Sequence, residues 1–497
     1  MEAPISRLIL TNGQIFTQNK IISGFLVIEG NSIQQIGEGA YIRRNSETII
    51  DVQQALIIPG FIDMHVHFRD MEQASKETLE SGSKGALHGG VTSVVTMPNT
   101  IPPLSTPTVL KKYWQKIKSQ PVYCNIGYYA SVKAGFSLSN IPEMKKLGIQ
   151  GIKIYPGDFS EELELQWKDG WRSDLDPTEF SQKIPEILKN FQNEYPAWKK
   201  LFETAKEHDL LILFHPELPR EANLRHKIYE HGLQIAKTEK VPNPHLFAHH
   251  VAHPVYTNEL ALVEMLISLL YKYFPDPTQA PHVHFVHVSS ANVVEIIHLM
   301  LKQKGYPCSI EASPHHLFLN YDMLFSSENK AKVLVPLRSA EIQENLKKKW
   351  QENQIDTIGT DHAPHTLAEK QQDFSTAPSG FPSIDFAGQI LLSQVFENQI
   401  SLEQLVNMYS TRPAQLLKLN RKGIIAPQMD ADLIVVRKTD PYKISQAQMK
   451  SKQKWTPWDS FQVSAEIEYV ILGGHLVYDK SKDLCLPHGN FLMNKDE

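Results

Sequence analysis

Two histidines, His65 and His67, stand two positions apart near the end of an apolar run that starts at Ile57. Alternate residues of a β-strand face the same side, so both imidazoles are expected to point to one place. Imidazole nitrogen is a preferred ligand of zinc and similar divalent metals. Two histidines on one strand face can also line an ordinary polar surface. The pair therefore indicates a metal site only if further ligands follow downstream.

Four more side chains that could serve a metal site lie near the ends of later apolar runs. They are Lys153, His215, His287 and Asp361. A single histidine at a strand end is more often a satisfied core or surface residue than a ligand. Six candidate positions at strand ends are hard to explain by coincidence, so the sequence predicts a metal centre.

Lys153 is the unusual member of this set, because a protonated amine repels a cation. Burial and nearby positive charge both lower the pKa of a lysine, and so favour its neutral form. A neutral amine could add carbon dioxide to give a carbamate, whose two oxygens could bridge two metal ions. A lysine that merely extends from a strand end toward water is the plainer alternative.

The segments that must position these residues alternate between strand-like apolar runs and helix-compatible stretches. The eight runs cover residues 61–68, 91–97, 122–129, 149–155, 210–215, 283–288, 309–312 and 356–360. Eight such units predict an α/β protein with a (β/α)8 barrel of the TIM type, whose chemistry lies at the C-terminal strand ends. We assign residues 59–424 to this barrel. An insertion after the fourth strand, at about 158–208, is expected to be either a lid or a plain surface excursion.

Short strands separated by turn residues occupy both ends of the chain. Residues 7–10 and 24–28 are examples near the N-terminus, and the same pattern of short apolar runs bounded by turn residues recurs at 431–436 and 469–478. We expect residues 1–58 and 425–497 to pair into one small β domain outside the barrel.

Composition limits the classes of function. A net charge of −5 over 497 residues offers no positive field for nucleic acid. No run approaches the ~18 apolar residues of a membrane span, and the first residues show no secretory signal. Cys124, Cys308 and Cys485 are too few and too widely spaced for a disulfide framework or a Cys-x-x-Cys zinc site. We therefore expect a cytoplasmic protein that acts on a small molecule.

The motifs around these residues resemble those of the dihydroorotases, in the amidohydrolase superfamily, over most of residues 55–440. The resemblance is carried by His65-Val66-His67-Phe68-Arg69, Met97-Pro98-Asn99-Thr100, Gly151-Ile152-Lys153-Ile154-Tyr155, and the segments 313–319, 359–366 and 377–382. These motifs are more specific than the metal pattern, which hydantoinases, dihydropyrimidinases and allantoinases share. A lysine on the fourth strand resembles the dihydroorotases with a carboxylated lysine more than the bacterial forms with aspartate there.

The resemblance implies a two-zinc hydrolase of cyclic amides. One zinc ion would be held by His65, His67 and Asp361. The other would be held by His215 and His287, and carboxylated Lys153 would bridge the two ions. Asp361 would also move the proton when N-carbamoyl-L-aspartate and L-dihydroorotate are interconverted in pyrimidine synthesis.

The resemblance also implies substrate contacts and an assembly. Arg69, Asn99 and His365 match positions that bind the carboxylate and ring of the substrate. The planar fork of Arg69 suits a carboxylate, whereas Asn99 could equally be a turn residue. His315 and His316 are assigned to structural hydrogen bonding. Homodimers are common among the relatives, so a homodimer is expected.

Two departures from the family pattern keep other functions open. Leu334 occupies a position where relatives usually have a side chain that makes a polar contact with the substrate. Arg338 could supply that contact instead. Asp158 stands where they have a threonine, and its charge is unfavourable near an anionic ligand unless it is paired. One alternative is another cyclic-amide hydrolase, of the hydantoinase, dihydropyrimidinase or allantoinase type. The other is a non-catalytic relative, which would be expected to have lost metal ligands.

Overall fold

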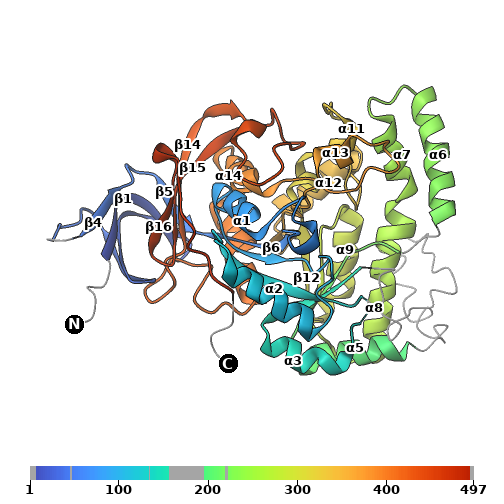
Figure 1. Ribbon diagram of the computed structural model, residues 1–497, viewed down its shortest axis with the longest axis horizontal. Helices are drawn as coiled ribbons and strands as arrows, with labels where there is room; N and C mark the ends of the chain where they lie inside the picture. Colours follow the sequence, from blue (N-terminus) through green and yellow to red (C-terminus); the bar gives the residue numbers. More distant parts are fainter. Residues whose placement is uncertain (1–6, 45–46, 134, 156–194, 219–221, 493–497) are drawn as a thin grey trace. The chain divides into compact units, whose positions relative to one another are not determined.

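The computed structural model describes residues 7–44, 47–133, 135–155, 195–218 and 222–492 (Figure 1). The chain divides into two compact units. One comprises Met1–Thr96, Trp114–Gly127 and Pro382–Glu497, and the other Met97–Tyr113 and Tyr128–Phe381. Among the helices of these described ranges, none has the length and apolar character that a membrane crossing requires.

An eight-stranded parallel sheet forms the barrel in the described part of the chain, and its strands neighbour one another in sequence order. They are β6 (Phe61–Val66), β7 (Val91–Thr96), β8 (Asn125–Ser131), β9 (Ile149–Ile154), β10 (Leu211–Phe214), β11 (Val283–Phe285), β12 (Cys308–Ala312) and β13 (Thr357–Ile358). Every residue of these strands is buried. Parallel strands buried on both faces read as continuous apolar runs, and all eight coincide with the runs expected from the sequence. The predicted (β/α)8 fold is confirmed.

Helices lie between successive strands along the chain. The longer ones are α1 (Leu79–His88), α2 (Pro107–Ser119), α5 (Pro196–Glu207), α6 (Ala222–Thr238), α7 (Pro244–Ala252), α8 (Ala261–Tyr273), α9 (Ala291–Met300), α12 (Ala340–Gln351) and α14 (Ala387–Phe396). Helix α1 begins with a capping box between Thr78 and Ser81. It stops before Gly90, whose φ of +75° is the left-handed conformation that favours glycine after a helix.

Shorter helices occupy the remaining connections. They are α3 (Ile141–Lys146), α10 (Pro314–Phe318), α11 (Glu328–Ala331), α13 (Leu367–Lys370), α15 (Leu402–Val406) and α16 (Arg412–Leu416). Two π-helical segments, η4 (Val255–Leu260) and η8 (Asn407–Thr411), run directly into α8 and α16.

The insertion expected at 158–208 falls mostly outside the described residues, as does Asp158. Its described end forms α5, which leads into β10. Trp198 of α5 stacks on Phe214 of β10 with ring centroids 5.6 Å apart. This part of the segment is therefore a helix packed on the next barrel strand.

The connection between β10 and β11 is longer than a single helix. Helices α6 and α7 lie side by side (Figure 1) and are followed by η4 and α8. This pair of helices was not predicted from the sequence. The end of α7 and the π-helix η4 both contribute side chains to the candidate site.

Within the described residues, a nine-stranded sheet joins strands from both ends of the chain. Its strands are β1 (Arg7–Thr17), β2 (Lys20–Glu29), β3 (Ser32–Glu38), β4 (Thr48–Asp51), β5 (Leu56–Pro59), β14 (Leu433–Lys443), β15 (Gln462–Leu472), β16 (His475–Asp479) and β17 (Leu484–Cys485). Strand β5 pairs in parallel with β1 and antiparallel with β14, which links the two ends. Its core is apolar and includes Leu10, Ile57, Leu433 and Ile471. The expected β domain from both chain ends is confirmed, whereas the boundaries at 58/59 and 424/425 stay predictions.

After β17 the chain returns to the start of β8. Gly489 N donates to Val122 O at 2.9 Å, and Leu492 N donates to Ile126 O at 2.9 Å. The sequence offers no periodic pattern that would have predicted this contact. Cys124 and Cys308 are buried, and Cys485 is half-buried.

Candidate metal centre

All six expected metal ligands lie on a barrel strand or within three residues after its end. His65 is on β6, Lys153 is on β9, and His67 follows β6 directly. His215 follows β10 directly, His287 lies two residues past β11 and Asp361 lies three residues past β13. Each of the six is less than 9% exposed. The strand ends of this (β/α)8 barrel therefore carry a group of buried side chains, including histidine and aspartate, which are residue types that can bind metal.

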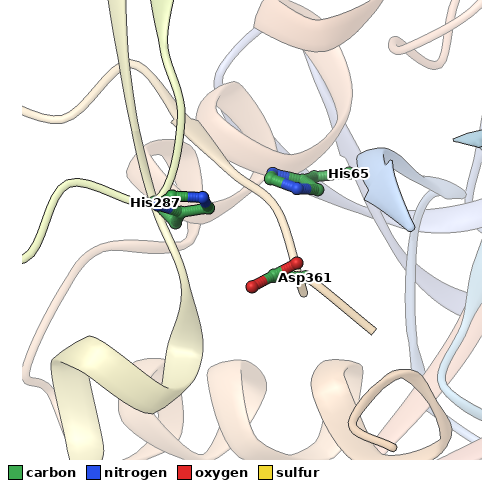
Figure 2. A group of neighbouring side chains, drawn as sticks. All are labelled: His65, His287 and Asp361. Atoms are coloured by element: carbon green, nitrogen blue, oxygen red, sulfur yellow. The ribbon is translucent and has the colours of Figure 1, made fainter. Parts of the chain in front are cut away.

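Three of these side chains gather in one place. The ligand atoms of His65, His287 and Asp361 lie within 4.8 Å of one another, and Figure 2 shows the three side chains facing a common space. His287 and Asp361 have φ angles of 37° and 48°. Residues other than glycine adopt such angles at a free-energy cost, and they are found where a side chain must be aimed. The rings of His65 and His67 have centroids 5.4 Å apart.

His215 joins this group through His287. Its Nδ1 lies 3.0 Å from His287 Nε2, and its Nε2 donates to Glu217 Oε2 at 2.8 Å. Burial lowers the pKa of His215 below its ordinary value, so the neutral ring is favoured. Ligands ~2.0–2.1 Å from a tetrahedral zinc ion have their nitrogens roughly 3.3 Å apart. The observed separation of the two nitrogens is close to what a shared metal ion requires.

Lys153 is buried completely, and its Nζ has no hydrogen-bond partner among the described residues. It lies 4.9 Å from the centre of the Tyr155 ring. Burial lowers the pKa of Lys153 to about 7, although the carboxylates of Glu311 and Asp361 favour its charged form. A buried polar atom without a partner destabilises a fold by ~1–3 kcal/mol. Modification of this amine to a carbamate would supply the missing interaction.

Glu217 is a site residue that the sequence analysis missed. Besides His215, it accepts hydrogen bonds from His253 Nδ1 at 2.8 Å and from Asn258 Nδ2 at 2.7 Å. Burial alone would raise the pKa of Glu217, but the charge of His253 and the hydrogen bonds from both histidines hold it well below the ordinary value. The spacing could have revealed it, because Glu217 follows His215 by two residues, as His67 follows His65.

Glu311 is a second buried carboxylate that was missed, on β12. It accepts a hydrogen bond from the backbone N–H of His287 at 3.1 Å and lies 3.4 Å from His284 Nε2. A glutamate inside the fully buried strand 308–312 was the available signal, because a buried charge needs partners. Its contact with the His287 backbone helps to hold that ligand in its left-handed conformation.

Two buried histidines hold the segment that contains Leu334. His249 Nε2 donates to Val333 O at 3.0 Å, and His316 Nε2 donates to Val335 O at 3.1 Å. Burial lowers the pKa of His249 and of His316 well below the ordinary value, so both rings are neutral donors. The hydrogen bond to Val335 O confirms the structural role expected for His316. Leu334, which lies between the two held residues, is half-buried.

Arg338 does not provide a replacement for the polar contact that Leu334 lacks. Its guanidinium is buried and donates to Ser289 Oγ at 2.8 Å, to His253 O at 2.6 Å and to the carboxylate of Glu259 at 3.2 Å. The side chain is thus engaged with protein partners. The suggested role of Arg338 toward a substrate is not supported.

Arg69 lies in a turn of unusual backbone conformation. Arg69, Asp70 and Met71 have φ angles of 53°, 54° and 50°. The Asp70 carboxylate stabilises this turn by accepting hydrogen bonds from Met71 N at 2.6 Å and Leu79 N at 2.9 Å. The turn fixes the direction in which the buried Arg69 side chain leaves the backbone, two residues after His67.

The other expected substrate contacts, Asn99 and His365, lie on loops after strands. Asn99 is half-buried, three residues past β7. His365 is buried, with its Nδ1 3.7 Å from the carboxylate of Glu369. A Cβ atom on Gly380 would lie 2.6 Å from Ala363 O and 3.4 Å from His365 Cδ2, so only glycine fits there. The substrate roles of Arg69, Asn99 and His365 stay predictions.

Two buried lysines hold the loop that contains Gly380. Lys332 Nζ donates to the carbonyls of Phe374 and Ala377, both at 2.6 Å. Lys370 Nζ donates to Pro378 O at 2.8 Å and Gly380 O at 3.0 Å. Burial lowers the pKa of Lys332 to about 8, and burial with the nearby charge of Lys332 lowers the pKa of Lys370 to about 7. These lysines donate hydrogen bonds, whereas Lys153 Nζ has no hydrogen-bond partner among the described residues.

Comparison with known proteins agrees with this architecture. Residues 56–477 match the model of the amidohydrolase family. A dihydroorotase of Carboxydothermus hydrogenoformans is 32% identical over 84% of this chain and 85% of its own length. A dihydroorotase of Methanosphaera stadtmanae is 28% identical over 92% of each protein.

Among the solved structures with the same fold are hydantoinases. The L-hydantoinase (dihydropyrimidinase) of Arthrobacter aurescens has a TM-score of 0.79 at 22% identity, over 99% of this chain and 100% of its own. A D-hydantoinase from Bacillus sp. AR9 has a TM-score of 0.76 at 22% identity, over 98% of each chain. These likenesses show the fold, and the matches in sequence show the family. Because residues 56–477 match the family model and a relative is 32% identical over 84% of the chain, the chain belongs to the amidohydrolase family.

Proposed function

We propose that this chain is a zinc-dependent dihydroorotase, which interconverts N-carbamoyl-L-aspartate and L-dihydroorotate in pyrimidine biosynthesis. The observation that carries the proposal is the gathering of His65, His287 and Asp361 at the barrel strand ends. His215 lies against His287, and Lys153 offers a buried amine without a hydrogen-bond partner among the described residues. The relatives named dihydroorotase, similar over most of this chain, favour this substrate among the cyclic amides.

The donor set fits two zinc ions. His65, His67 and Asp361 would hold one ion, and His215 and His287 would hold the other. Carboxylated Lys153 would lie between them. Bound zinc would lower the pKa of a water molecule toward ~7 and would polarise the carbonyl of the cyclic amide.

Asp361 would move the proton during the reaction. In hydrolysis the oxygen of water forms a bond to the ring carbonyl carbon, and the bond from that carbon to the ring nitrogen breaks. Asp361 would accept the proton of the water and deliver it to the leaving nitrogen, as base and then as acid. In ring closure the same carboxylate would remove a proton from the carbamoyl nitrogen.

Arg69 would bind the carboxylate of the substrate. A guanidinium presents two parallel N–H donors to a carboxylate. The backbone conformation of the turn at Arg69–Met71 fixes the position of the Arg69 Cα and the direction of its side chain. Asn99 and His365 would contact the ring and the carboxylate from other strand ends. An acidic substrate is therefore favoured over a neutral one.

A second candidate is another hydrolase of cyclic amides, and Leu334 is the observation that favours it. A leucine cannot donate a hydrogen bond, and Arg338 is engaged with Glu259, Ser289 and His253. A non-catalytic relative is disfavoured because all six expected ligands are present.

The test is the ratio of kcat/KM between substrates for the zinc-loaded protein. L-Dihydroorotate, hydantoin, dihydrouracil and allantoin are compared at one pH, and ring closure is followed with N-carbamoyl-L-aspartate. We expect the highest kcat/KM with dihydroorotate. A higher value with one of the other three would establish the second candidate. A zinc content near zero in protein purified without chelator would instead indicate a non-catalytic relative. The expected homodimer is tested by light scattering on the same preparation.

A further inference from the structure

A buried carboxylate, Glu217, connects His215 to the helices that follow β10. Its Oε2 accepts a hydrogen bond from His215 Nε2 at 2.8 Å. Its Oε1 accepts one from His253 Nδ1 at 2.8 Å and one from Asn258 Nδ2 at 2.7 Å. All four residues are less than 9% exposed. Water therefore has little access to these hydrogen bonds, and each partner depends on the others.

The contact with Glu217 decides which nitrogen of His215 carries the proton. An ionised carboxylate can only accept, so the proton of the neutral ring stands on Nε2 and the lone pair on Nδ1. Nδ1 is the atom that lies 3.0 Å from His287 Nε2. Without Glu217 the ring could exchange its tautomers and rotate, and either change would remove the lone pair from this position.

Glu217 is itself fixed by two later elements of the chain. His253 directly follows α7, and Asn258 lies in the π-helix η4. The backbone around them is held as well, because Arg338 donates to the carbonyl of His253 at 2.6 Å. The long connection between β10 and β11 thus carries two donors that both point to the carboxylate near its start.

We propose that Glu217 is a positioning residue of the metal centre, which holds His215 with Nδ1 toward the metal, and that His253 and Asn258 hold Glu217. The inference rests on the proposed metal centre. Carboxylate partners of metal-binding histidines act in this way in general, and their loss lowers metal affinity or activity by ~10–100-fold. The connection through α7 and η4 thereby contributes to the site, because it supplies His253 and Asn258.

The variant Glu217→Gln tests this role directly. The three partners of Glu217 are all donors, and its two oxygens accept from all of them. Glutamine has one oxygen and one NH2 group, so at least one partner must meet a donor. If the NH2 group faces His215, that ring must move its proton to Nδ1 and cannot bind metal there.

The experiment measures zinc binding by the full chain. Wild-type protein, Glu217→Gln and Glu217→Asp are stripped with a chelator and titrated with Zn2+ against a competing indicator. We expect two zinc ions in the wild type. We expect one of them to bind about 10–100-fold more weakly in Glu217→Gln. Glu217→Asp keeps the charge but withdraws the carboxylate from His215, so its affinity for one zinc ion should also fall. This variant carries the test if Glu217→Gln does not fold. The absorption spectrum with Co2+ should change in both variants.

A matched control loosens α7 at its other end. Glu328 accepts hydrogen bonds from His245 N at 2.8 Å and Leu246 N at 3.0 Å, in the first turn of α7. Glu328→Gln should bind both zinc ions like the wild type. Folded Glu217 variants with wild-type zinc affinity would overturn the inference, and so would an equal loss in Glu328→Gln. Wild-type protein that binds no zinc would contradict the proposed function itself, so the two failures can be told apart.

Discussion

The strand ends of the barrel and the core of the nine-stranded sheet bury opposite kinds of side chain. The strand ends bury His65, Lys153 and Asp361, and left-handed backbone occurs there at His287 and Asp361. The sheet core buries leucine, isoleucine and valine from both ends of the chain, such as Ile57 and Leu433. Buried polar groups are unfavourable unless they are paired, whereas apolar burial stabilises by ~25 cal/mol per Å². The difference indicates that one region was selected for chemistry and the other for stability.

The largest effect is expected at the strand ends, from Asp361→Asn. Asparagine keeps an oxygen for the metal but cannot accept and return a proton. We expect kcat to fall by about 10²–10⁴-fold, the usual contribution of general acid–base catalysis, while most of the zinc stays bound. Steady-state kinetics and metal analysis on one preparation check this. Full activity in the variant would remove Asp361 from its proposed role.

Lys153→Met separates function from stability at one position. Methionine fills the space without placing an amine in the barrel, so the metal-free variant should melt no lower than the wild type. Its activity should fall by more than about 100-fold, beyond the effect of losing a residue that only supports a ligand. A clearly lower melting temperature would show that the unmodified amine stabilises the fold.

Lys332→Met provides the contrast for Lys153. Lys332 donates to two backbone carbonyls, at Phe374 and Ala377. Its loss should lower the melting temperature, because buried acceptors left without donors destabilise by ~1–3 kcal/mol each. Equal changes in melting temperature for the two lysine variants would contradict the contrast between Lys332, which donates two hydrogen bonds, and Lys153, which donates none to the described residues.

In the sheet core, Leu433→Ala should change stability and leave the chemistry intact. Leu433 is fully buried on β14, between β5 and β15. Truncation of a buried leucine typically lowers the free energy of unfolding by ~2–5 kcal/mol. Denaturant unfolding measures this loss, with the half-exposed Leu486→Ala as control. A large fall in kcat for folded Leu433→Ala would contradict the assignment of the sheet core to stability alone.

The smallest effect concerns pH and Lys370. The pKa of Lys370 is about 7 in the folded chain and ~10.4 when unfolded. Between these values the unfolded chain binds more protons, so the contribution of Lys370 makes stability rise with pH from about 7 upward. Melting temperatures at pH 7, 8 and 9 should therefore rise less steeply in Lys370→Met than in the wild type. The exposed Lys304→Met is the control, and an equal reduction of the slope there would contradict the assignment.

The sequence predicted those features that depend on the pattern of apolar and turn residues within one short segment. The eight barrel strands could be predicted because burial on both faces makes each a continuous apolar run. His65 and Asp361 could be selected because the first lies near the end of such a run and the second follows one directly. The β domain could be predicted because strands near both chain ends share the same pattern of short apolar runs and turns.

What sequence reasoning missed depends on contacts between distant segments. Glu217 gains its partners only when α7 and η4 bring His253 and Asn258 to it, and no periodicity encodes that meeting. The engagement of Arg338 with Glu259 and Ser289 likewise follows from packing, so its side chain could not be placed in advance. The return of residues 489–492 to the start of β8 is a third example.

The most direct test of the central claim is the dependence of L-dihydroorotate hydrolysis on bound zinc. The wild-type chain is assayed as purified, after removal of metal with a chelator, and after addition of two equivalents of Zn2+ with bicarbonate. We predict that activity is lost with the metal and restored by zinc. Unchanged turnover in the stripped protein, or no turnover of dihydroorotate with both zinc ions bound, would contradict the account.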